Sequence, residues 1–272
     1  YVLANAMDKA VLNGFNNYAG NTTYGLWTRT RQVSDFKTVN GAALDTGNLV
    51  KTVEDAPFPE LAKAEAGYTS ALGLWGVTMS LTIQALINDD LGEFMSALNR
   101  AGAIAQRTID KEVIAQLVAA TWTNNTTTSA GLSASGTPTP EKLDLVRQAF
   151  INKVGPGGEI MGNVPKFLLH NPQNAFAADV ATGRVVPGGL ATLPSARAGA
   201  IQPIETPYAF TNATDYYLLA DPTLADTVVL LKLLGMENPV IEEYDAGAVA
   251  AKKWKMYLPF AAKPVVMSIG GT

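Results

Sequence analysis

Only one histidine and no cysteine occur among the 272 residues of this sequence, which leaves few groups for nucleophilic or metal chemistry. A hydrolase triad needs a nucleophile, a base and an orienting acid, and no motif with that spacing surrounds the histidine, His170. The lack of cysteine also excludes disulfides, thiolate metal ligands and thiol nucleophiles. We expect His170 to be a packed or surface side chain without a catalytic role.

Motifs that bind phosphates, dinucleotides or zinc are missing as well. The sequence contains no GxSxG, no HExxH, no GxGxxG opening a helix and no glycine-rich loop ending in Lys-Ser/Thr. Glycine turns at residues 155–158 and 187–189 lack the lysine that would contact a phosphate. We therefore predict no catalytic, cofactor-binding or metal-binding residue, and a protein that is not an enzyme and needs no cofactor.

Two pairs of adjacent acids could be considered for acid–base chemistry, Asp89 with Asp90 and Glu242 with Glu243. Neighbouring side chains point apart on a helix and on a strand, so neither pair converges on one substrate atom. Asp89 and Asp90 stand where a helix is expected to begin, and carboxylates there cap free amides. A calcium site would need more oxygen ligands at defined spacing. We interpret the acids as capping or solvated charge.

The densest basic patch consists of Lys252, Lys253 and Lys255, with Trp254 between them. Interleaved basic and aromatic side chains can bind nucleic acid. On a strand, however, alternation places Lys253 and Lys255 on one face and Trp254 on the other, which is typical of a half-buried strand. We favour the half-buried strand and expect the lysines to face carboxylates.

The overall composition favours a globular protein that associates with other chains. Hydrophobic residues make up 47% of the sequence and charged residues only 16%, so less charge than usual is available for a fully solvated surface. The formal net charge of −4 disfavours tight binding to nucleic acid, because that affinity depends on lysines and arginines. We also expect no membrane span, since no apolar run approaches about 20 residues.

The elements that would position these residues begin with a long amphipathic helix over residues 89–118. Its apolar side chains recur at helical spacing, and its charged residues, Asp110 among them, are expected to lie mostly off that stripe. The predicted stripe comprises Leu91, Phe94, Met95, Leu98, Gly102, Ala105, Ile109 and Val113.

Further elements are mixed in order. Thr139-Pro140 is expected to start a second helix with proline at its first position, and the segment at 166–170 reads as a strand followed by a helix over 172–180. Predicted strands then follow one another at residues 216–220, 227–234, 240–244, 252–257 and 265–269. This order predicts the α+β class rather than a repeating βαβ series.

The N-terminal part carries weaker signals. Residues 1–34 are rich in Asn, Thr, Gly and Tyr and are expected to form an irregular, extended arm. Turn signals at Asn40-Gly41 and at 46–48 divide short strand-like pieces. The stretch from residue 55 to 80 overlaps a strand-like segment at 75–81 and suggests a long and partly exposed hairpin.

One motif connects these elements to a known family. The segment 80–91, SLTIQALINDDL, runs from a strand into the long helix and resembles the Mu-type branch of tailed-phage major capsid proteins with the Hong Kong 97 fold. The segment 164–172, VPKFLLHNP, is similar to the strand of that family that leads into a helix, and 216–222 and 252–259 fit its returning strands. The resemblance covers most of residues 35–270.

The resemblance implies a Hong Kong 97-like fold with an N-terminal arm, an extended loop, a spine helix, a peripheral domain and an axial domain. The implied boundaries are 1–34 for the arm, 35–54 for the start of the peripheral domain, 55–80 for the extended loop, 81–135 and 222–258 for the peripheral domain, and 136–221 and 259–272 for the axial domain. Some relatives join subunits through Lys–Asn bonds, but no acid and asparagine partner is identifiable here for Lys63, so that chemistry is not assigned.

The implied function is a major capsid protein that assembles into the hexamers and pentamers of an icosahedral phage head around double-stranded DNA. Its implied partners are further copies of itself, a portal, and a scaffold, protease or decoration protein, with packaged DNA bound without specificity. The implied location is the virion, assembled in the cytoplasm of a bacterial host. The alternatives are an encapsulin-like compartment shell, an enzyme of unknown type and a monomeric binding module.

Overall fold

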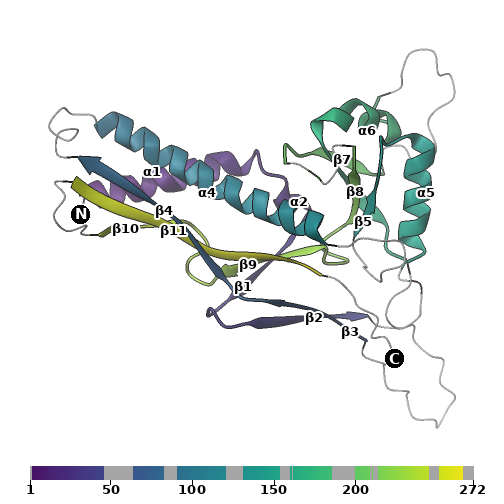
Figure 1. Ribbon diagram of the computed structural model, residues 1–272, viewed down its shortest axis with the longest axis horizontal. Helices are drawn as coiled ribbons and strands as arrows, with labels where there is room; N and C mark the ends of the chain where they lie inside the picture. The colour runs from purple at the N-terminus through teal and green to yellow at the C-terminus, as the bar shows by residue number, and fades with distance from the viewer. Residues whose placement is uncertain are drawn as a thin grey trace, which may run out of the picture.

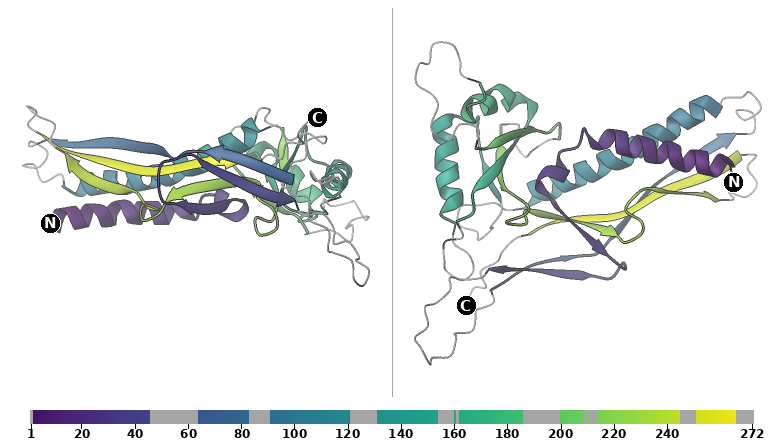
Figure 2. Two further views of the ribbon diagram at one scale, coloured as in Figure 1. Left: turned by 90° about the horizontal axis from the view of Figure 1, so that it is seen from below. Right: turned by 180° about the vertical axis from the view of Figure 1, so that it is seen from behind.

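The computed structural model describes residues 2–45, 64–82, 91–120, 131–153, 160, 162–185, 200–208, 210, 214–244 and 251–265. Figure 1 shows an elongated molecule in which two long helices lie over one face of a long sheet, while a second group of helices and strands lies at one end. Figure 2 shows the same layers from below and from behind. The mixture of helices and strands confirms the predicted α+β class.

Helix α4 (Leu91–Ala119) is the predicted long amphipathic helix. Its stripe faces the main hydrophobic core, where Leu98, Ile109 and Val113 are fully buried. Burial of each such side chain contributes about 1.5–3 kcal/mol, so the stripe fixes the orientation of the helix. Asp110, which we expected to lie off the stripe, is also buried.

Helix α1 (Val2–Ala19) replaces the irregular arm that we expected at the N-terminus, and this part of the prediction is wrong. Met7, Val11 and Phe15 recur every four residues and are buried against α4. This stripe is hard to recognise in the sequence because the asparagines between its members give the segment a polar composition. In the structure those asparagines do not face the core. A short helix, α2 (Tyr24–Trp27), follows.

The backbones of α1 and α4 approach closely at two glycines. A Cβ atom on Gly14 of α1 would lie 1.9 Å from the carbonyl oxygen of Asn99, and one on Gly102 of α4 would lie 2.1 Å from that of Val11. No side chain fits at either distance, so glycine at these positions permits the helices to pack in contact.

The main sheet lies beneath the helices and consists of five strands. Strands β1 (Arg29–Val33), β9 (Val228–Leu233), β11 (Ala251–Pro264) and β10 (Val240–Tyr244) follow in that order, and β4 (Gly73–Thr82) pairs with the other edge of β11. Only the β1–β9 pair is parallel. Strand β11 is longer than the predicted strand at 252–257, and the expected domain boundary at 258/259 falls inside it.

A second sheet has the order β5 (Gly131–Ala134), β8 (Tyr216–Ala220), β6 (Pro165–His170) and β7 (Gln202–Glu205). Every residue of β8 is buried, because one face of this sheet packs on the main core and the other on helices α5 (Pro140–Ile151) and α6 (Ala175–Ala181). Strand β5 belongs to this sheet although it precedes the boundary expected at residue 136.

Two predictions about helix starts here are confirmed. Thr139 caps α5 by accepting a hydrogen bond from the amide of Lys142, and Pro140 occupies the first helical position. The short helix η1 (Pro172–Asn174) leads into α6 after the strand β6, as the sequence indicates.

The predicted hairpin is placed differently from our expectation. Strands β2 (Val39–Asp45) and β3 (Ala64–Ser70) form a two-stranded antiparallel pair that diverges from the main sheet (Figure 2). The paired strands thus begin well before residue 55, and the segment 73–80 joins the main sheet as part of β4 instead. The predicted strand at 75–81 is confirmed, but its partner is β11.

The helix contact yields a prediction with a matched control. Gly102→Ala should destabilise the subunit by about 1–3 kcal/mol, because the added methyl group overlaps the backbone of α1. Gly92→Ala, in the same helix, meets nothing within 4 Å and should stabilise it by about 0.5–1 kcal/mol through helix propensity. Urea unfolding of the two variants measures both effects, and equal stability of the two would contradict the described packing.

Candidate functional site

Of the residues considered for catalysis, the structure describes His170, Glu242 and Glu243. His170 is buried at the end of β6, with its Nδ1 atom 2.9 Å from the carbonyl oxygen of Asn171, so of the two expected placements, packed or on the surface, it has the packed one. Among the described residues no group of three or more His, Cys, Asp or Glu side chains could hold a metal ion. Asp89, Asp90 and Lys63 lie outside the described residues.

The basic patch on β11 has the alternation that the sequence predicts. Trp254 is buried against Phe94 of α4, with ring centroids 5.1 Å apart, whereas Lys255 is exposed. The ammonium of Lys255 forms an ion pair of 2.7 Å with Glu242 on β10, which also accepts a hydrogen bond from Tyr257. The patch is therefore part of a half-buried strand, and Lys255 faces a carboxylate.

Sequence reasoning missed the role of Asp110, whose carboxylate caps a helix from a distance. Its Oδ1 atom accepts hydrogen bonds from the amides of Thr23 and Tyr24, at 3.2 and 3.1 Å, and from the Thr23 hydroxyl at 3.3 Å. Thr23 itself makes no side-chain cap for α2. A residue of α4 thus satisfies amides that the start of α2 leaves free, and ties the N-terminal segment to α4.

Burial dominates the electrostatics of this cap. It raises the pKa of Asp110 above its ordinary value of 3.8, while the hydrogen bonds from Thr23 and Tyr24 oppose the rise. Tyr208 reaches the same region by donating a hydrogen bond to the carbonyl oxygen of Arg107, and burial beside Asp110 raises its pKa to about 12. The carboxylate is held by neutral donors.

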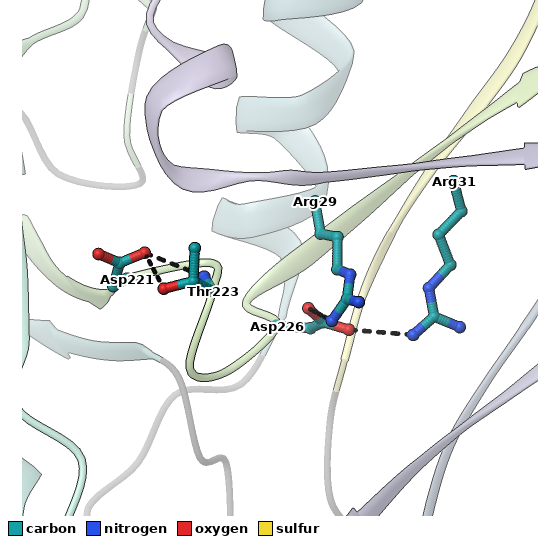
Figure 3. A network of polar contacts seen from close by, with 5 residues as sticks. All are labelled: Arg29, Arg31, Asp221, Thr223 and Asp226. Carbon is teal, nitrogen blue, oxygen red and sulfur yellow. Dashed lines mark hydrogen bonds and ion pairs between the residues drawn. The ribbon is translucent and has the colours of Figure 1, made fainter.

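A second polar network lies at the joint between the two sheets, which we define as residues 221–227, the connection from β8 to β9. Figure 3 shows that Asp226 lies between two arginines of β1. Its Oδ1 and Oδ2 atoms are each 3.3 Å from a guanidinium nitrogen, of Arg29 and Arg31 respectively. The joint is thereby fixed to the main sheet at its C-terminal end.

The other end of the joint is fixed by Asp221. Its carboxylate accepts hydrogen bonds from the amide and hydroxyl of Thr223, and it pairs with Lys166 at the start of β6. The hydrogen bond from Lys166 and those from Thr223 lower the pKa of Asp221 to about 2. Asp221 is therefore ionised at neutral pH, and each end of the joint is held by an ion pair.

Hydrophobic side chains are exposed along β4 and the adjacent flank of α4. A cavity of about 220 Å³ opens beside Val77, Ile104 and Trp75, and a second one of about 440 Å³ continues from Trp75 toward Ser70. Trp75 stacks on Phe260 with ring centroids 5.2 Å apart. Trp75 and Phe260 line both cavities, and we call the pair of cavities the flank groove.

The polar networks described above are contacts within the subunit that hold its elements together. The described residues hold two clamped carboxylates, one buried helix cap and an apolar groove, but no constellation for catalysis among them. No helix among the described residues has the length and hydrophobicity needed to cross a bilayer.

Comparison with known proteins points in the same direction. A family profile described as phage capsid protein matches residues 67–268 of the chain. No protein of curated function matches the sequence.

Several solved structures resemble the chain in fold at low sequence identity. The virus-like particle from Pyrococcus furiosus has a TM-score of 0.56 at 12% identity, covering 97% of this chain and 96% of that one. The capsid of Ralstonia phage GP4 has a TM-score of 0.57 at 11% identity, with coverage of 89% and 86%. The capsid of Cyanophage P-SCSP1u has a TM-score of 0.53 at 12% identity, with coverage of 90% and 85%.

The clamp at the joint can be tested by charge removal. Asp226→Asn should lower the free energy of unfolding by about 1 kcal/mol, because two arginines lose a largely buried carboxylate but are themselves partly solvated. Asp35→Asn removes an exposed pair with Lys37, at 3.8 Å, and should change stability by less than about 0.5 kcal/mol. Urea unfolding of both variants checks the difference, and an Asp226→Asn variant as stable as the control would contradict the clamp.

The buried cap of α2 predicts a pH dependence with a definite sign. A carboxyl group whose pKa is raised by folding contributes stability at low pH, and this contribution is lost as the pH rises through the folded pKa. The unmodified subunit should therefore gain stability relative to Asp110→Asn as the pH falls from about 7 toward about 4.

The measurement is chemical denaturation of both proteins across that pH range. Asp8→Asn, at an exposed position of α1, corrects for the general loss of one negative charge. The prediction is contradicted if the unmodified subunit loses stability relative to Asp110→Asn as the pH falls. That result would mean that the hydrogen bonds to the carboxylate lower its pKa more than burial raises it.

Proposed function

The chain belongs to the phage capsid protein family, and on this premise we propose that it is the major shell subunit of a tailed-phage head, assembling into hexamers and pentamers around double-stranded DNA. It has the Hong Kong 97-like capsid fold and is a capsid shell protein of the virion, in a family of structural proteins rather than enzymes. The observation that carries the proposal is the family match, which extends from within β3 to beyond the end of β11.

The arrangement of elements supports a division of the subunit into two domains. We infer that the main sheet with α4 and α1 forms the peripheral domain, and that the second sheet with α5 and α6 forms the axial domain. The second sheet is contributed by residues 131–220 alone, which are inserted between α4 and β9. The diverging β2–β3 pair is the counterpart of the extended loop.

The charge of the chain supports a shell that encloses DNA without holding it. The formal net charge is −4, and Lys255, Arg29, Arg31 and Lys166 are all paired with carboxylates of the same chain. With a net negative charge, the chain has no excess of cations to displace counterions from phosphates. Weak contact would let the genome slide during filling and release.

The remaining partners follow from the same proposal. A portal is expected at one vertex, and a scaffold, protease or decoration protein would act during or after assembly in the cytoplasm of the bacterial host. The sequence motif at 80–91 supports the Mu-type branch, and it lies largely outside the described residues.

Assembly of the purified protein tests the proposal. The expressed chain should form closed shells of uniform size, visible by negative-stain electron microscopy and eluting far ahead of a 28.7 kDa monomer in size exclusion. Shell diameter separates the proposed head from the alternative compartment, because a head must hold a genome. A stable particle with the mass of one chain would contradict the proposal and favour a monomeric binding module.

A further inference from the structure

Helix α4 carries three exposed basic side chains along its solvent side, Arg100, Arg107 and Lys111, which we call the basic ridge. At about 100° per residue, their positions lie within about 40° of one another around the helix, and they span about 16 Å along its axis. Figures 1 and 2 show α4 running along the length of the molecule on one side of the main sheet. The three cations therefore form a straight row on that side.

The subunit does not neutralise this row. Among the described residues, no carboxylate forms an ion pair with any member of the basic ridge. The acids of α4 are placed elsewhere: Asp110 is buried in the cap of α2, and Glu112 is half-buried and accepts a hydrogen bond from Gln116. Glu93 lies on the same side of the helix but about 10 Å before Arg100.

The spacing within the ridge is unfavourable for an isolated subunit. Arg107 and Lys111 are four residues apart, and like charges at this spacing repel each other and destabilise a helix. The chain has 24 acidic residues against 20 basic ones, yet none of the described acids relieves this repulsion by an ion pair. An anionic partner from outside the subunit would relieve it.

The chemistry of the ridge fits duplex DNA better than an acidic protein. Between Arg100 and Lys111 the only other exposed residue of α4 is Ile104, which cannot hydrogen-bond to a base edge, so the row can hold phosphates but cannot read sequence. Duplex DNA presents one charge per about 1.7 Å, or about nine along the ridge. An extended polypeptide presents at most one charge per about 3.3 Å. The denser polyanion is therefore the favoured partner.

We propose that the basic ridge contacts the phosphates of packaged duplex DNA, so that the α4 side of the main sheet faces the interior of the shell. The proposal rests on the proposed function, because only a shell around a genome brings DNA to this surface. The net charge of −4 does not prevent such a contact, since charges more than about 8–10 Å away are largely screened at physiological salt. Contact through three cations is weak and salt-sensitive, which is compatible with a genome that slides.

DNA binding by unassembled subunits tests the contact. The ridge variant combines Arg100→Gln, Arg107→Gln and Lys111→Gln, all at exposed positions, and circular dichroism checks that it folds. Fluorescence anisotropy of a labelled duplex gives the affinity at several low salt concentrations. Each phosphate contact contributes about 0.9 to the slope of log affinity against log salt, so the ridge variant should lose about 2–3 from this slope and bind about tenfold more weakly or worse.

A matched control removes the same charge away from the ridge. It combines Lys142→Gln and Arg147→Gln on α5 with Lys253→Gln on β11, and it should keep the slope of the unmodified chain. An equal loss in the control, or no DNA binding by the unmodified subunit at any salt concentration, would overturn the inference. Binding of poly-glutamate as tight as that of DNA would also overturn it, in favour of an acidic polypeptide partner.

Labelling of empty shells tests which side faces inward, and the lack of cysteine in the chain makes it site-specific. Ile104→Cys places a thiol on the ridge. A small maleimide should label it in intact shells, whereas a polyethylene glycol maleimide too large to cross the wall should label it only after the shells are dissociated. Labelling of intact shells by the large reagent, or protection from both reagents, would overturn the inference and leave the proposed function standing. A chain that forms no shells would contradict the proposed function itself.

Discussion

Strand β11 is the element on which the rest of the structure depends, because it is hydrogen-bonded along both edges. One edge pairs with β4 over ten residues, and the other pairs first with β10 and then with β9. Its alternate side chains, from Trp254 to Ala262, form the floor on which α4 lies. A one-residue change in its register would move this floor to the opposite face, so the pairing on both sides fixes the position of the helix layer.

Much of the fold could be predicted from the sequence where a pattern is local. The stripe of α4 runs along consecutive turns of one helix and the cap of α5 lies within one turn, so hydrophobic spacing and a Thr-Pro start are enough to identify them. The alternation around Trp254 likewise predicts a half-buried strand, since it needs only the period of a strand. The family motifs then supplied the function, which no catalytic residue could have indicated.

The missed features depend on pairs of residues distant in the sequence. Helix α1 is stabilised by its contact with α4, where Gly14 and Gly102 let the two backbones approach closely. The capping role of Asp110 depends on amides 86 and 87 positions earlier in the chain. The four-residue spacing of Met7, Val11 and Phe15 in α1 is obscured by the asparagines between them. Periodicity carries no signal for the cap, and the partner strand of β4 is also distant in the sequence. The flank groove combines side chains of α4, β4 and β11, so no single segment of the sequence indicates it.

The joint at residues 221–227 has a geometric consequence for a closed shell. It connects the two sheets by a short segment whose ends are fixed by Asp221 and Asp226. Every subunit repeats the angle that this segment sets, and repeated angles of one sign add up around a circumference. In a shell built from many copies, the angle held at this joint would bear on the curvature of the wall and on the volume that it encloses.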